Sequence, residues 1–221
     1  LRGVVPPGEI GTRLLNGLAR QVTPILDSLP VRPDDPVVHH DIALDLGAVR
    51  LTGRVATQQD LVLQVGFGKV SPARRLAVWL HLLALSASTS RPWRGLLVGR
   101  GDRVALRAPD RATATRLLDH WVRLYRIGLN APLPLPLRFG VRLADLAAAG
   151  TDPFDQLREL GYLYREDRSP QWQQFYADVA DLLAVRVGGD DLDQPAEDVL
   201  AIAASRAIWL PLSAHETVAA R

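Results

Sequence analysis

The chain has 221 residues, of which 48% are hydrophobic, and its formal net charge of +2 excludes a polybasic protein that binds nucleic acid through overall charge alone. It contains no cysteine, which excludes disulfides and thiolate metal sites and favours a cytoplasmic location. The sequence also lacks methionine, which indicates a piece of a longer protein, and its longest apolar run, Leu76 to Leu85, is too short to span a bilayer.

Residues 1–36 are predicted to form a helix and a linker. Apolar residues recur at helical spacing between Glu9 and Leu29. Pro24 lies inside this stretch and is expected to kink or end the helix. The proline and aspartate residues between Val31 and Pro36 predict a linker before the next element.

Residues 37–137 are predicted to form an α/β core. Alternating or continuous apolar runs predict five strands, at 38–46, 49–55, 61–65, 95–99 and 103–107. A helix is predicted over 73–87, with Ser71 as its N-cap. Because this helix is apolar on nearly all sides, we expect it at the centre of the core. A further helix is predicted from Pro109 to about Ile127.

Residues 138–221 are predicted to form a helical C-terminal part of the same domain. The alternating prolines of 131–136 require an extended segment before it. Periodic apolar residues then predict helices near 141–149, 154–160, 172–184 and 196–209. The order of elements therefore predicts an α/β fold of the α+β kind, with additional C-terminal helices.

Three strands followed by a buried helix is also the core order of the PD-(D/E)xK nuclease superfamily. Active members hold Mg²⁺ with an Asp at the end of one strand and an Asp/Glu-x-Lys on the next. Aligned on this pattern, the chain has Ala56, Gln64 and Gly66 in place of the two acids and the lysine. Its one lysine, Lys69, does not restore the motif, because Phe67 would then stand at the acidic position. The resemblance implies a degenerate restriction-endonuclease-like core with no catalytic residue, no metal and no cofactor.

Two later segments resemble the C-terminal domain of RecC, the exodeoxyribonuclease V gamma subunit. They are the helix from Arg75 to Ala87 and the run from His120 to Pro134, where the family has a similar Tyr-x-x-Gly-Leu-x-x-Pro-Leu pattern. Three shorter segments fall in the family order, so that the resemblance covers nearly the whole chain: Pro6-Pro7-Gly8, Gly189-Asp190-Asp191 and Trp209-Leu210-Pro211-Leu212.

This resemblance implies a non-catalytic domain of a large subunit of the RecBCD helicase-nuclease, which processes double-strand DNA ends for recombinational repair. In that family the domain helps to split the duplex with a protruding pin and routes the strands to motor subunits, and the active sites are expected in other subunits. The implied partners are RecB-like and RecD-like subunits and forked or single-stranded DNA, with no membrane. The hairpin around Gly99 to Arg107 is a candidate for the pin.

A cluster of arginines around one aromatic residue predicts contact with DNA phosphates and stacking of a base on the ring. Its members are Arg91, Trp93, Arg94, Arg100, Arg103 and Arg107. The pattern equally fits a solvated hairpin with Trp93 in the core. The competing hypothesis for the whole chain is an active Mg²⁺-dependent nuclease that uses other carboxylates, which would converge beside the strand that ends near Phe67.

Overall fold

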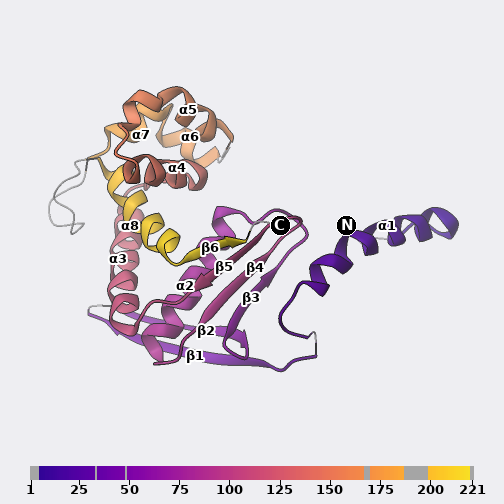
Figure 1. The fold of residues 1–221 in the computed structure, drawn as a ribbon. Helices are drawn as coiled ribbons and strands as arrows, with labels where there is room; N and C mark the ends of the chain where they lie inside the picture. The colour runs from indigo at the N-terminus through magenta and orange to yellow at the C-terminus, as the bar shows by residue number, and fades with distance from the viewer. Residues whose placement is uncertain (1–4, 33, 48, 167–169, 187–198, 220–221) are drawn as a thin grey trace.

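A computed structural model describes residues 5–32, 34–47, 49–166, 170–186 and 199–219, and it confirms the mixed α/β fold (Figure 1). Six strands form one sheet in the order β1-β2-β3-β4-β5-β6. Their bounds are β1 Val37–Leu46, β2 Val49–Gln58, β3 Leu61–Val65, β4 Arg94–Val98, β5 Arg103–Arg107 and β6 Glu216–Ala219. Strands β3 and β4 are parallel, and the other neighbouring strands are antiparallel.

Helix α2 (Pro72–Ser88) covers one face of the sheet (Figure 1). It begins where the sequence predicts, because the Ser71 side chain accepts a hydrogen bond from the Arg74 amide and Pro72 occupies the first turn. Trp79, Leu82 and Leu83 of this helix are at most 1% exposed and pack in the main core with Val62 of β3. The prediction of a central helix is therefore confirmed.

The opposite face of the sheet is covered only in part. Helix α1 (Gly8–Asp27) extends away from the sheet, and only Gly11 and Ile25 of this helix are buried (Figure 1). Ile25 packs with Leu61, Leu96 and Val98, which point away from α2. Of the two outcomes expected at Pro24, a kink or the end of the helix, the second is wrong, since α1 continues to Asp27.

Most of the remaining helices form a second, smaller core, whereas the last helix packs mainly in the main core (Figure 1). The remaining helices follow α3 (Arg111–Asn130) and comprise α4 (Leu137–Ala148), α5 (Leu157–Glu166), α6 (Pro170–Phe175), α7 (Val179–Ala184) and α8 (Leu200–Ala214), with a short 3₁₀ helix at Pro153–Gln156. The helix predicted over 172–184 is thus two helices, α6 and α7. The predicted Gly189-Asp190-Asp191 loop lies outside the described residues.

The predicted helical C-terminal part, residues 138–221, also contains a strand that the sequence did not predict: β6 returns to the sheet and pairs with β5. Glu216 at the start of this strand has a side chain only 6% exposed, and it forms an ion pair with Arg75 of α2. The Arg75 guanidinium also lies 5.6 Å from the centre of the Trp209 ring. Because a buried carboxylate requires such a partner, this ion pair joins the last strand to the central helix.

No helix within the described part of the chain is long and apolar enough to cross a membrane.

Candidate nucleic-acid interface

The arginines singled out between 91 and 107 lie at two opposite ends of the β4–β5 pair. Arg94 is paired with Arg107 across the two strands at one end. Val98 is paired with Arg103 at the other end, next to the turn that carries Arg100. Since β4 is five residues long, about 13 Å separates the two ends. The structure therefore divides the predicted cluster into two groups.

Two arginines of the first group, Arg94 and Arg91, contact other side chains of the protein. Arg94 donates two hydrogen bonds to the carboxylate of Asp60, at 2.8 and 2.9 Å. This contact lowers the pKa of Asp60 and raises the pKa of Arg94, because each charge stabilises the other. Arg91 lies over the indole of Trp93, 5.2 Å from the ring centre. Arg107 is exposed at the same end of the sheet.

Trp93 is a core residue, and the stacking role predicted for it does not fit the structure. The side chain is 1% exposed, its Nε1 donates to Thr89 Oγ1 at 2.7 Å, and its ring meets the ring of His40 edge to face at 4.9 Å. A nucleotide base stacks on an exposed ring face, which Trp93 does not offer.

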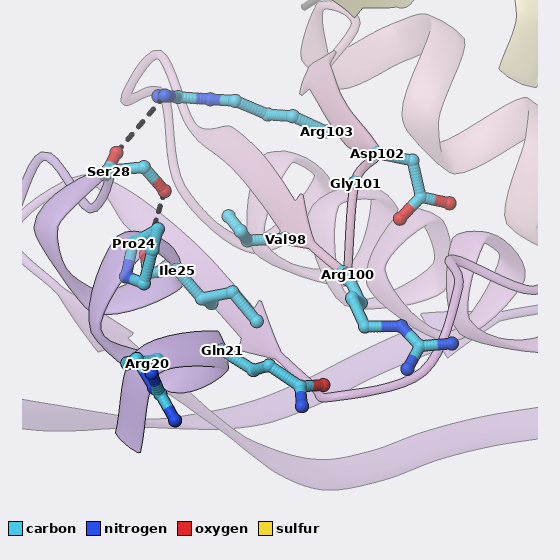
Figure 2. Close-up of a pocket in the computed structure, with 11 residues that line it drawn as sticks. Arg20, Gln21, Pro24, Ile25, Ser28, Val98, Arg100, Gly101, Asp102 and Arg103 are labelled. Carbon is cyan, nitrogen blue, oxygen red and sulfur yellow. Dashed lines mark hydrogen bonds between the residues drawn. The ribbon is translucent and has the colours of Figure 1, made fainter. Parts of the chain in front are cut away.

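The second group lines a groove between the end of α1 and the β4–β5 turn (Figure 2). The groove has a volume of about 730 Å³, and its basic residues are Arg20 from α1, Arg100 from the turn and Arg103 from β5. Arg103 reaches across to α1 and donates to the Ser28 carbonyl at 3.1 Å. The carboxylate of Asp102 points away from Arg103 in Figure 2 and accepts the amide of Val70 at 2.7 Å.

Two further cations lie at this end of the sheet. The Arg100 amide donates to the Gly68 carbonyl at 3.2 Å, so that the exposed Lys69 lies next to the turn. The Arg100 guanidinium lies 5.2 Å from the centre of the exposed Phe67 ring. On the α2 side, Arg74 contacts Gly66, where β3 ends. We call the five residues Arg20, Lys69, Arg74, Arg100 and Arg103 the basic end.

Charge pairing distinguishes the basic end from strand β2. No ion pair joins any of its five residues to a carboxylate within the described part of the chain. By contrast, Arg50 and Arg54 of β2 pair with Asp45 and Asp41, at 3.8 and 2.7 Å. Five cations without carboxylate partners, contributed by α1, the β3–α2 loop, α2, the β4–β5 turn and β5, make this end attractive to an anionic ligand.

Two of these five residues, Arg20 and Arg74, were hardly identifiable as part of a common surface from local patterns. Arg20 lies on the polar side of a helix, some eighty positions before the arginines that it joins, and the pattern of α1 alone does not place it beside β5. Arg74 follows the N-cap Ser71 by one turn, so its place in the helix was predictable. Its contact with Gly66 depends on how α2 crosses β3, which a local pattern does not specify.

The three positions aligned with nuclease catalytic residues do not converge on one point. Gln64 and Gly66 alternate with Val65 and share the face of β3 that packs under α2, as Val62 does. Ala56 lies between the buried Val55 and Thr57, is exposed, and therefore points to the other face. The alignment that placed Ala56 in a common site with Gln64 and Gly66 is corrected by this register.

The surroundings of Gly66 are basic. A Cβ atom added to Gly66 would lie 2.8 Å from Cζ and 2.9 Å from Nη2 of Arg74, so the guanidinium lies against the bare backbone. Gln64 Oε1 is buried and has no hydrogen-bond partner. Among the described residues, no group of three or more His, Cys, Asp or Glu side chains is arranged to hold a metal ion.

Comparison with known proteins relates the chain to RecC subunits. The family model described as RecC C-terminal domain matches residues 1–148. Two proteins named RecBCD enzyme subunit RecC, from Mycobacterium tuberculosis strains CDC 1551 / Oshkosh and ATCC 25618 / H37Rv, are each 29% identical over 232 residues, which cover 97% of this chain and 21% of the relative. A protein of the same name from Mycolicibacterium smegmatis is 33% identical over 162 residues, which cover 69% of this chain and 15% of the relative. The chain spans about a fifth of the length of the tuberculosis relatives.

Proposed function

Since this chain belongs to the family of RecC C-terminal domains, we propose that it is a DNA-guiding and scaffold domain of a RecBCD-type helicase-nuclease, without catalytic activity of its own. In this proposal it works in the cytoplasm, during the repair of double-strand breaks by recombination. It contacts RecB-like and RecD-like subunits and forked or single-stranded DNA. Cleavage and ATP hydrolysis belong to the other subunits.

The observation that carries the proposal is the basic end. Arg20, Arg100 and Arg103 line one groove, and none of them has a carboxylate partner in the described part of the chain. Guanidinium groups match phosphate oxygens with two parallel hydrogen bonds, and they remain charged at all physiological pH values. Phosphate contacts position a nucleic acid without reading its sequence, as a guiding surface requires.

The β4–β5 hairpin contributes to this surface through its turn. Strand β5 is paired on both sides, with β4 and with β6, and the turn is bonded to Gly68 and Val70. A duplex-splitting pin must project freely, which this hairpin does not. We therefore assign the Gly99–Arg107 segment to strand guidance and propose no pin here.

The proposal of a non-catalytic domain is supported by the chemistry beside β3. An amide at Gln64 and a hydrogen at Gly66 supply neither charge nor a proton-transfer group. The nearby Arg74 guanidinium would repel Mg²⁺ from the place where an active nuclease binds it. These features favour the guiding role over the competing hypothesis of an active nuclease.

Binding of labelled single-stranded and forked DNA, titrated at several salt concentrations, tests the proposal. Wild-type affinity should fall steeply with salt, because each neutralised phosphate releases about one counterion. Arg100→Ala with Arg103→Ala should flatten the slope of log affinity against log salt by about one unit for single strands, without a change in sequence preference.

The matched control is Arg50→Ala with Arg54→Ala, which changes the net charge equally but removes arginines already paired with Asp45 and Asp41. This control should leave the slope near the wild-type value. Equal slopes for all three proteins, or a wild type that does not bind DNA, would contradict the proposal.

A further inference from the structure

Arg74 carries a charge that the folded chain leaves uncompensated. Its side chain is half-buried at the first turn of α2, and no hydrogen bond or ion pair of its guanidinium is found among the described residues. The neighbouring Arg75, in contrast, is paired with the buried Glu216. A half-buried guanidinium without a carboxylate partner keeps its donors available, so we expect it to meet an anion in the working protein.

The space for that guanidinium exists because residue 66 is a glycine. A Cβ atom at this position would lie within 3 Å of Cζ and of both terminal nitrogens of Arg74. Any other residue would therefore push the guanidinium away from β3. Gly66 also keeps its amide in the sheet, where it donates to the Val98 carbonyl at 2.9 Å. Gly66 thus allows two things at once: its amide pairs with β4, and the Arg74 guanidinium lies against its backbone.

A second unsatisfied polar group faces the same side. Gln64 lies two residues earlier on β3, about 7 Å away along the strand, and its Oε1 is buried without a hydrogen-bond partner. An amide side chain can present either its NH₂ or its oxygen after rotation about the last bond. After this rotation the Gln64 NH₂ is a donor on the same side of the sheet as Arg74.

We propose that Gly66, Arg74 and Gln64 form a phosphate-binding site for the backbone of single-stranded DNA. The site lies on the α2 side of the sheet, and the groove of Arg20, Arg100 and Arg103 lies on the other side of the same end. This phosphate-binding site rests on the proposed function and adds a specific contact to that function. In chemical terms, a guanidinium binds the phosphate where a nuclease would bind a metal ion, so the strand is held and left intact.

Exposed Lys69 and Arg100 lie between the two sides and favour a nucleic acid as the source of the phosphate. Arg100 stacks on Phe67, one residue after Gly66, and its amide is bonded to Gly68. A polyanion that passes over this loop would meet cations on both sides of the sheet. Free inorganic phosphate would meet the Arg74 site alone, which allows the two sources to be distinguished.

The test measures the affinity of the chain and its variants for a labelled single strand by fluorescence anisotropy at fixed salt. Arg74→Gln should weaken binding about tenfold, the loss expected for one charged hydrogen-bonded contact. Gly66→Ala should weaken binding to a similar extent by displacing the guanidinium. Two controls should stay within about twofold of wild type: Arg54→Gln, which removes an exposed charge on β2, and Gly53→Ala, whose new Cβ would meet no atom within 4 Å.

Two further measurements separate binding from folding and from free phosphate. The melting temperature of Arg74→Gln should equal or exceed that of wild type, because an uncompensated charge is removed, whereas a structural role would lower it. A strand with neutral methylphosphonate linkages should bind wild type and Arg74→Gln equally. Inorganic phosphate should displace the strand only at millimolar or higher concentration.

Undiminished affinity of Arg74→Gln, with wild type still binding DNA, would overturn the Arg74 site and leave the proposed function intact. Displacement by micromolar inorganic phosphate would also overturn it, because the site would then be selective for the free ion. Failure of wild type to bind DNA at all would remove the proposed function together with the site.

Discussion

The indole of Trp93 is fixed by contacts on several sides. Its Nε1 is bonded to Thr89 at the end of α2, its edge meets His40 of β1, and Arg91 lies over it from the solvent side. These contacts connect the start of β4 with the central helix and with β1. Trp93 therefore stabilises the sheet through packing, and Arg91 lies over its ring.

Trp93→Ala should lower the free energy of unfolding by about 3–5 kcal/mol, the usual cost of deleting a buried tryptophan side chain. Urea denaturation at pH 7 measures this directly. Binding of single-stranded DNA by the folded fraction should be unchanged. A variant as stable as wild type but with weaker DNA binding would instead restore the stacking role for this ring.

Local sequence patterns predicted the role of single residues better than the face of the sheet to which their side chains point. Ser71 was identifiable as an N-cap because the cap, the proline after it and the apolar run all agree. The face of Ala56 was not identifiable, because a shift of one residue in strand pairing turns every side chain to the opposite side of a sheet. Only the observed register, in which Gln58 pairs with Leu61, determines it.

Among the elements, α1 has the least contact with the rest of the protein. Its apolar residues follow a helical stripe, yet Ile10 is 70% exposed, Leu14 50% and Leu18 44%. Ile25, near its C-terminal end, is 9% exposed and packs against β3 and β4. The helix is therefore anchored at one end, and its contribution to stability should be concentrated there.

Substitutions in α1 test this distribution. Ile25→Ala should cost about 2–4 kcal/mol of unfolding free energy, since it removes a buried side chain from the cluster under β3 and β4. Leu18→Ala, the same kind of truncation two turns earlier, should change stability by less than about 0.5 kcal/mol because the side chain is exposed. Chemical denaturation of both variants gives the comparison. Similar losses for the two would mean that α1 packs along its whole length.

Elements with a long periodic pattern were predictable from the sequence, and short non-local ones were not. The strands of the β1–β2 hairpin have ten residues each, and α2 has a cap and an apolar run of ten. Strand β6 has four residues, too few for alternation to be recognised, and it forms only because β5 offers an open edge. The groove was likewise beyond prediction, since it joins residues 20–28 to residues 98–103 through tertiary packing.

At the scale of the whole molecule, positive charge is distributed unevenly over the surface. The net charge is only +2, yet five cations without carboxylate partners in the described part of the chain lie together at one end of the sheet. Arginines elsewhere on the surface, such as Arg94 and Arg142, are held by carboxylates in two-point contacts. An uneven distribution of this kind attracts a polyanion to one place while the molecule as a whole stays nearly neutral.

The whole chain should not cleave DNA in the presence of Mg²⁺ or Mn²⁺. Incubation of the purified protein with linear duplex, forked and single-stranded DNA, followed by gel analysis, measures this. Asp102→Asn is the informative companion variant, because Asp102 is a carboxylate beside the end of β3 and its Oδ1 has no partner. Cleavage that depends on the metal and disappears in this variant would establish the competing nuclease hypothesis.

The pairing of β5 with β6 has a consequence for how the protein is made. More than a hundred residues separate the two strands in the chain, so β5 leaves the ribosome long before the strand that covers its edge. At bacterial rates of synthesis this interval is roughly ten seconds. During that time the nascent chain presents an unpaired strand edge, which is a site for association with other unfinished chains. Completion of the sheet therefore waits for the synthesis of β6, and the Arg75–Glu216 ion pair then joins this strand to α2.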